Sequence, residues 1–205
     1  MPLAQPELDL LWDFSDAPAS EKRLREAAES AVDPGVRAEL QTQVARALGL
    51  QDRFAEADAL LDTITSDAPA VRTRVVLERG RVRNSRGEPD AAVPFFRSAA
   101  EVAAAADLVF LQVDALHMLA IAEPAHAGRW TARAQEVLAD VTDERTLRWN
   151  VALHNNAGWT SFDAGRIDEA IAAFERARQA AVRWGTPQQV QWAGEALEEA
   201  RAARG

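Results

Sequence analysis

The feature that most constrains the fold of this chain is one spacing of small and apolar residues that recurs along it. Seven, five, four and three positions separate successive members of the set Gly158, Gly165, Ala170, Phe174 and Ala177. Two further sets keep this spacing: Gly80, Gly87, Ala92, Phe96 and Ala99, then Ala45, Asp52, Ala57, Leu61 and Ile64. A looser copy covers residues 116–141. The first residues of the copies lie about 35 to 40 positions apart, which predicts an array of four similar units.

Each unit is expected to be a pair of helices. The apolar residues on both sides of a short turn follow a helical period. Gly165 and Gly87-Glu88-Pro89 lie in these turns, where they end one helix and begin the next. The small residues let the two helices approach closely, and Phe96 or Phe174 is expected to fill the space between neighbouring units. One such hairpin cannot bury its apolar face alone, so the pattern predicts stacked hairpins and an all-α fold.

This pattern resembles the tetratricopeptide repeat (TPR) family. The last unit is similar to the family motif from Asn156 and Gly158 through Gly165 and Asp168-Glu169-Ala170-Ile171 to Phe174 and Ala177, and Pro69 lies where such units often end. The resemblance implies a right-handed superhelix of about four repeats, with hairpins at about 38–71, 73–106, 113–146 and 151–184. Arg83 and Ser161 depart from the family by replacing a bulky aromatic residue, and Trp149 precedes the last unit instead of lying within it.

The segments outside residues 38–184 are expected to cap the repeats within one structural domain. Residues 1–37 are predicted to hold an N-terminal arm and a capping helix over 20–32, with Ser20 as N-cap. Residues 187–205 are predicted to form a C-terminal capping helix that begins at Pro187. Pro94 falls inside a predicted helix, so we expect a kink or a late helix start there.

Composition limits the classes of partner. The formal net charge of −9 argues against nucleic acid, because a protein that binds a duplex usually presents a strongly positive surface. The chain has no cysteine, which excludes disulfides and thiolate metal sites. The first residues lack the pattern of a signal peptide, and no apolar run reaches the roughly 20 residues that cross a bilayer. A cytoplasmic protein with no membrane partner is therefore expected.

The TPR resemblance also indicates which residues would face a partner. In that family the first helices of successive units line a concave groove. The residues predicted to bind a partner there are Arg46, Arg74, Arg81, Asn84, Asp114, His117, Asn155, Asn156 and Trp159.

Residues 72–87 form the most distinctive part of this predicted groove, because they hold six arginines in an acidic protein. Arg74, Glu78 and Arg81 are spaced to share one helical face. Arginine binds carboxylates through two parallel hydrogen bonds, so a carboxylate-bearing peptide is the ligand that these residues favour. The alternative is that Arg74 and Arg81 pair with Glu78 within the helix, and that the remaining arginines face solvent or pair with the next helix.

Three other groups of residues also leave alternatives open. Asn155 and Trp159 could bind a peptide backbone and an apolar side chain, or Trp159 could pack on the final helix near Trp192 or against Ile121. Asp114, His117 and His154 could form a metal site or an acid–base pair, but a histidine held by a hydrogen bond is the simpler explanation. The apolar and acidic segment LDLLWDF, residues 8–14, could meet a partner or a second copy, or its Leu11, Trp12 and Phe14 could cap the first repeat's core.

These observations predict a non-catalytic scaffold without a cofactor or a metal. Its concave groove would bind a peptide or protein segment, and the chain would be similar to the TPR modules of bacterial signalling and transcription regulators. No phosphate loop, nucleophile elbow or dinucleotide motif is present in the sequence. A self-assembling scaffold that forms a homodimer is the alternative, and a small-ligand or metal-dependent enzyme is a third.

Overall fold

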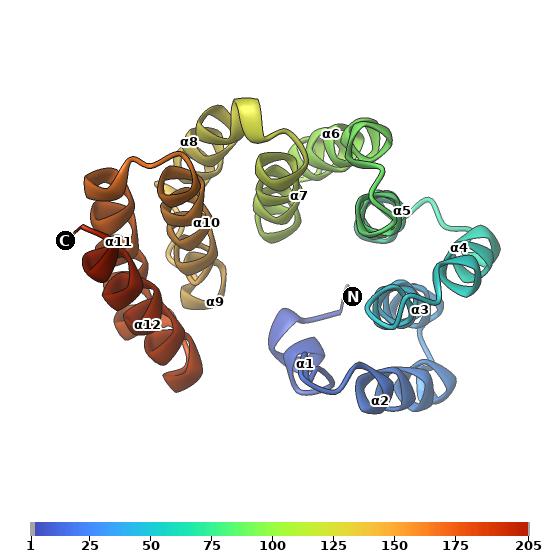
Figure 1. Cartoon of the computed structure of the whole chain (residues 1–205). Coiled ribbons are helices and arrows are strands. Elements are labelled where there is room, and N and C mark those ends of the chain that lie inside the picture. Colours follow the sequence, from blue (N-terminus) through green and yellow to red (C-terminus); the bar gives the residue numbers. More distant parts are fainter. Residues whose placement is uncertain (1–2, 205) are drawn as a thin grey trace. The chain divides into compact units, whose positions relative to one another are not determined.

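The structure is a computed structural model that describes residues 3–204, and all of the regular secondary structure in these residues is helical (Figure 1). The prediction of an all-α protein is therefore confirmed. The helices are α1 (Gln5–Asp9), α2 (Ala17–Ser30), α3 (Pro34–Gly49), α4 (Phe54–Thr63), α5 (Pro69–Ser85), α6 (Pro89–Ala105), α7 (Val109–Ala122), the 3-10 helix η1 (Pro124–His126), α8 (Ala127–Leu138), α9 (Glu144–Leu147), α10 (Trp149–Asp163), α11 (Ile167–Trp184) and α12 (Pro187–Ala203).

The contacts between helices divide the chain into two compact units, residues 1–118 and 119–205. In the first unit α2 packs on α3, α3 packs on α4 and α5, and α5 packs on α6 (Figure 1). In the second unit α10 packs on α8 and α11, and α11 packs on α12. Helices that follow one another in sequence are thus packed in neighbouring pairs. The prediction of one continuous domain stays a prediction.

The turns between paired helices lie where the spacing places them. Asp52, Gly87 and Gly165 have φ values of 59°, 80° and 73°, in the left-handed region. They follow α3, α5 and α10, and each is the second member of its spaced set. Glycine reaches this region without a steric penalty, and aspartate is among the few other residues that enter it. The second position of the spacing is therefore a position that ends a helix.

The helices of a pair approach closely at a glycine and a phenylalanine. A β-carbon added to Gly80 would lie 2.4 Å from the Phe96 ring, and one added to Gly158 would lie 2.4 Å from the Phe174 ring. Both phenylalanines have no exposed surface. The predicted close approach is confirmed. Each phenylalanine ring lies between the two helices of its own hairpin, and not only between neighbouring units as expected.

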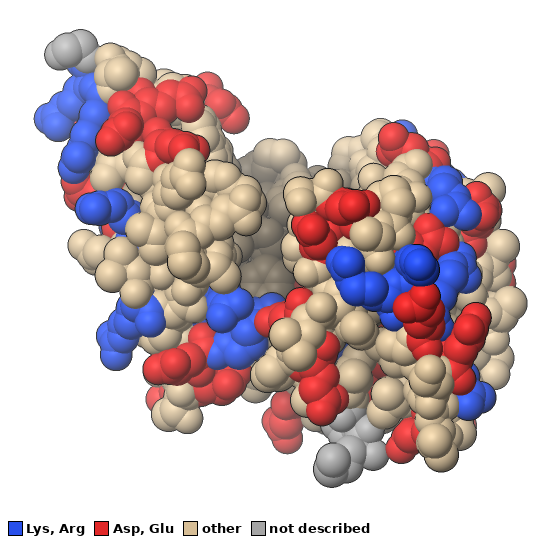
Figure 2. Space-filling model, turned by 90° about the horizontal axis from the view of Figure 1, so that it is seen from below, with Lys and Arg blue, Asp and Glu red and all other residues tan. Residues whose placement is uncertain are grey.

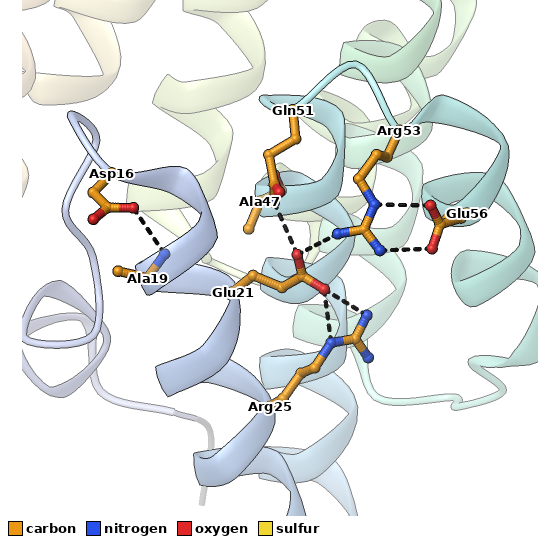
Figure 3. A network of polar contacts seen from close by, with 8 residues as sticks. All are labelled: Asp16, Ala19, Glu21, Arg25, Ala47, Gln51, Arg53 and Glu56. Carbon is orange, nitrogen blue, oxygen red and sulfur yellow. Dashed lines mark hydrogen bonds and ion pairs between the residues drawn. The ribbon is translucent and has the colours of Figure 1, made fainter.

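A network of polar contacts around Glu21 holds α2 against the turn between α3 and α4 (Figure 3). Its Oε2 accepts hydrogen bonds from Arg53 Nη1 at 2.7 Å and Gln51 Nε2 at 2.9 Å. Its Oε1 accepts from Arg25 Nε at 2.8 Å, and Arg53 also pairs with Glu56 at 2.6 Å. Since Glu21 itself is buried, these charged hydrogen bonds offset the loss of its hydration.

The capping helices are present, but the prediction that Ser20 caps the N-terminal one was wrong. The helix begins at Ala17, and the Asp16 side chain accepts a hydrogen bond from Ala19 N. Pro18 in the first turn suits this earlier start, because proline lacks the N–H that would be unpaired there. Ser20 is buried inside the helix and donates its hydroxyl to Asp13 O at 2.9 Å.

At the other end of the chain, α12 begins at Pro187 as predicted. Thr186 and Gln189 form a capping box there, in which each side chain accepts a hydrogen bond from the backbone N–H of the other residue.

A late helix start at Pro94 was also a wrong expectation, because α6 runs from Pro89 through Pro94 to Ala105. Pro94 lies near the helix start, and the acceptor that its missing N–H leaves unpaired is the carbonyl of Asp90, four residues before it. Asp90 is exposed, so water can satisfy this carbonyl.

Candidate functional site

Charged residues from α3, α5 and α7 come together in the first unit. We call Glu39, Arg46, Arg74, Glu78, Arg81, Asp114 and His117 the arginine face. The charges of Arg74, Glu78, Arg81 and Asp114 all act on Arg46. His117 in turn is acted on by Asp114, Arg81 and Arg46. The structure therefore assembles five of the nine predicted partner-binding residues: Arg46, Arg74, Arg81, Asp114 and His117.

Arg74 is held by a buried ion pair across two helices. Its Nε donates to Glu39 Oε2 at 3.0 Å, and the two side chains are only 7% and 3% exposed. The alternative in which Arg74 pairs with Glu78 within α5 was wrong, because α3 brings Glu39 to it. A charge pair buried this deeply is destabilising to break, since either partner alone would be left without compensation.

Arg81 bridges two buried carboxylates on different helices. Its Nη1 donates to Glu78, as the intrahelical alternative predicted, and its Nη2 donates to Asp114 of α7. Burial opposes ionisation of Arg81, but Asp114 and Glu78 raise its pKa above the ordinary value. Burial also opposes ionisation of Asp114, but Arg81 and Arg46 hold its pKa below the usual range. For Glu78 burial outweighs Arg81, and its pKa is raised.

Arg46 differs from Arg74 and Arg81 because no acceptor within residues 3–204 takes a hydrogen bond from its guanidinium. The guanidinium instead lies 5.5 Å from the ring centre of Trp12 and 5.3 Å from that of Phe14. These two rings are stacked with their centres 4.8 Å apart and 3° between their planes. Burial and the neighbouring Arg81 lower the pKa of Arg46 to about 10. Arg46 therefore stays charged at neutral pH, with hydrogen-bond donors that the described residues do not use.

His117 is neutral at physiological pH, because burial lowers its pKa to about 4 even though Asp114 opposes that change. His154 lies in the second unit, where its Nδ1 is 3.4 Å from Gln135 Nε2. Within residues 3–204, no group of three or more histidine, aspartate and glutamate side chains is arranged to hold a metal ion. The enzyme hypothesis built on Asp114, His117 and His154 gains no supporting observation.

The remaining predicted residues are Asn84, near the end of α5 in the first unit, and Asn155, Asn156 and Trp159, on α10 in the second unit. Asn84 is half-buried near the end of α5. Asn155 and Asn156 are half-buried on α10, in the second unit. Their roles toward a partner stay predictions.

Trp159 packs inside the second unit. Its ring contacts Phe162 and Phe174 edge-on, with centres 5.5 Å and 5.0 Å apart. It also lies against the core formed by Ala196, Leu197 and Ala200 of α12. Trp192 is 55% exposed. The packing alternative for Trp159 thus describes its position, with Phe174 and α12 as its neighbours.

Sequence reasoning missed two parts of the arginine face. Glu39 was not singled out, because nothing in the sequence indicates that α3 carries it beside Arg74. The pairing of Arg46 with Trp12 and Phe14 was also missed. The expectation that Leu11, Trp12 and Phe14 cap the first core is met by Leu11 and Trp12, whereas Phe14 is 63% exposed. The signal in the sequence was the pair of aromatic residues flanking Asp13 in an otherwise acidic segment.

The surface carries mixed charge. On the face seen in Figure 2, arginines lie next to aspartates and glutamates rather than forming a separate basic patch. None of the helices described is both long and apolar enough to cross a membrane.

Comparisons with known proteins show similarity of fold. No family model and no curated protein matches the chain. Among solved structures, the chain is similar to the crystal structure of BtubC (BKLC) from P. vanneervenii, with a TM-score of 0.67 and 18% sequence identity. The similarity covers 96% of this chain and 84% of that chain. At this identity it supports a shared helical fold and carries no function with it.

Proposed function

We propose that this chain is a non-catalytic helical-repeat protein of the TPR type that binds a peptide or protein segment on its arginine face. Four hairpins in a right-handed superhelix are the arrangement we propose for the whole chain. The left-handed turn residues and the two glycine–phenylalanine contacts support repeated hairpins. The ligand class that we propose is a segment that carries carboxylates.

The observation that carries this proposal is the state of Arg46. Arg74 and Arg81 already donate to Glu39, Glu78 and Asp114. Arg46 lies beside them, is partly accessible, and donates to no residue described. A carboxylate that meets its guanidinium would form charge-assisted hydrogen bonds without breaking an existing pair. Charged hydrogen bonds of this kind contribute about 1.5–3 kcal/mol each.

The experiment compares capture of partners from the native cell lysate by the wild type and by Arg46→Gln. Arg72→Gln is the matched control, because Arg72 is an exposed arginine of α5 in the same unit. The segment of the captured partner that binds is then titrated against all three proteins. We expect Arg46→Gln to weaken binding by about tenfold or more, and Arg72→Gln to leave it within about twofold.

Circular dichroism checks that the variants are folded. Arg46→Gln should keep the fold, since Arg46 makes no hydrogen bond that the substitution would break. The substitution removes its contact with two rings and its charge beside Asp114 and Glu78, which keep their hydrogen bonds to Arg81. Equal binding by wild type and Arg46→Gln would contradict the proposed site.

Self-association into a homodimer stays the second proposal. The last two helices supply a surface for it, because Val182 of α11 is 67% exposed and Trp192 of α12 is 55% exposed. Exposed apolar side chains on a terminal repeat are where another repeat or another copy would stack.

A further inference from the structure

The N-terminal arm, residues 3–14, lies against the arginine face of its own unit. Leu3 N donates to Glu39 Oε1 at 3.0 Å, and Gln5 Oε1 accepts from Arg74 Nη2 at 3.5 Å. Leu8 is buried in the core that α2 and α3 form with α4. Figure 1 shows α1 close to α2 and α3. The first half of the arm thus covers the Glu39–Arg74 pair.

The second half of the arm meets Arg46. The stacked rings of Trp12 and Phe14 contact its guanidinium, an arrangement in which the ring faces attract a cation. Asp13 N donates to Ser20 Oγ at 2.8 Å, which ties this end of the arm to α2. The arm therefore covers Arg46, the arginine of this face whose donors no described residue uses, and contacts Arg74.

The chemistry of the arm is that of a ligand for this face. Residues 3–16 carry the acidic residues Glu7, Asp9, Asp13 and Asp16 and no basic residue. The arginine face carries Arg46, Arg74 and Arg81 beside Glu39, Glu78 and Asp114, and the arm contacts two of these arginines, Arg46 and Arg74. The arm's charge is thus opposite in sign to the arginines that it covers.

The arm is also only weakly stabilised in its place on the fold. Its helix α1 has five residues and no side-chain cap, and a helix this short is not stable by itself. Leu10 is 82% exposed and Phe14 is 63% exposed, so much of the arm's apolar surface is left in water. Leu8 is fully buried in the core, and Leu3, Leu11 and Trp12 are partly buried against it.

We propose that the N-terminal arm is a displaceable occupant of the arginine face, and that the partner which replaces it is an acidic segment carrying closely spaced aromatic residues. This inference rests on the proposed function, because it names the ligand class and the regulation of the same face. A partner must compete with the arm. Its apparent affinity is therefore its intrinsic affinity multiplied by the fraction of chains whose arm is released.

The test uses the arm itself as the ligand. A fluorescent synthetic peptide, LAQPELDLLWDFSD, with the sequence of residues 3–16, is titrated into the full chain and into the full-chain Trp12→Ala, Phe14→Ala variant. The variant weakens the arm in cis and leaves the face intact. We expect it to bind the peptide about tenfold more tightly than the wild type, because the competing arm is released more often.

Four controls establish what the peptide recognises. Full-chain Leu10→Ala changes an exposed residue of the arm and should bind like the wild type. A peptide with its four acidic residues replaced by amides should bind weakly, and raised salt should weaken the original peptide. Adding Arg46→Gln to the double variant should remove most of the binding.

A second measurement does not depend on weakening the arm. The chain has no cysteine, so Leu10→Cys offers a unique site for a nitroxide label on the arm. Excess unlabelled peptide should sharpen the electron paramagnetic resonance spectrum of the label, because the displaced arm moves more freely.

Equal peptide binding by wild type and double variant, or no binding to either, would overturn the proposal, as would a label spectrum that the peptide does not change. These outcomes would make the arm a fixed part of the core. They are distinct from failure of the proposed function, which is measured by whether Arg46→Gln loses a captured partner. Partner binding that depends on Arg46 without arm release would retain the function and reject the displaceable arm.

Discussion

Protonation of the His117 imidazole makes the stability of the folded protein depend on pH. Burial lowers its pKa to about 4 in the folded protein, whereas an unfolded histidine titrates near 6.5. Between these values the unfolded chain takes up a proton that the folded chain does not. The contribution of His117 to the free energy of unfolding is therefore fully present above about pH 6.5 and is lost as the pH falls towards 4.

We expect His117→Gln to remove this part of the pH dependence. Urea unfolding of wild type and variant at pH 7.0, 5.5 and 4.5 measures it, and the wild type should lose on the order of 2–3 kcal/mol more than the variant at the lowest pH. Glu78 acts in the opposite direction, because its pKa is raised by burial and its contribution is lost as pH rises. It is present in both proteins, so the difference between them reports on His117. Parallel curves for the two proteins would contradict the prediction.

At the scale of the helices, the glycine–phenylalanine contact sets how closely a hairpin can pack. In the interior of a helix, replacing glycine by alanine usually stabilises a protein by about 0.5–1 kcal/mol. At Gly158 the added methyl group would meet the Phe174 ring at 2.4 Å, so the sign should reverse. Overpacking of this kind destabilises by about 1–3 kcal/mol.

Gly194 in α12 provides the matched control, because nothing lies within 4 Å of a β-carbon added there. Urea unfolding followed by circular dichroism should show Gly158→Ala less stable and Gly194→Ala as stable as the wild type or more so. Gly80→Ala should behave like Gly158→Ala, because Phe96 lies against it in the same way. A stabilised Gly158→Ala would show that Phe174 moves aside at little cost.

At the scale of the whole molecule, the two compact units imply that a destabilising substitution in one unit affects mainly that unit. In repeat proteins each unit is stabilised mainly by its neighbours. We therefore expect Gly158→Ala to raise hydrogen exchange in α10, α11 and α12, and to leave exchange in α2, α3 and α5 unchanged. Hydrogen–deuterium exchange read by mass spectrometry measures this peptide by peptide. A uniform rise over residues 3–204 would instead indicate one cooperative unit.

The sequence by itself determined the helices, their turns and their closest contacts. The helical period and the residues that end a helix depend on neighbours a few positions away, so they can be read locally. For this reason Gly87 and Gly165 marked turns, and Gly158 with Phe174 marked a close approach. Where local rules competed, as at Ser20 against Asp16 and Pro18, the prediction of the helix start failed.

Only the tertiary structure decided how the charged residues are used. Arg74 could pair with Glu78 in its own helix but pairs with Glu39, 35 residues away. Arg46 meets Trp12 and Phe14 of the arm, and Trp159 turns towards Phe174 and α12. A long arginine side chain reaches several acids within one helix turn or across to the next helix, and local spacing does not choose among them. That choice follows from which helices pack together, since burial makes an unpaired charge unfavourable and an available partner decisive.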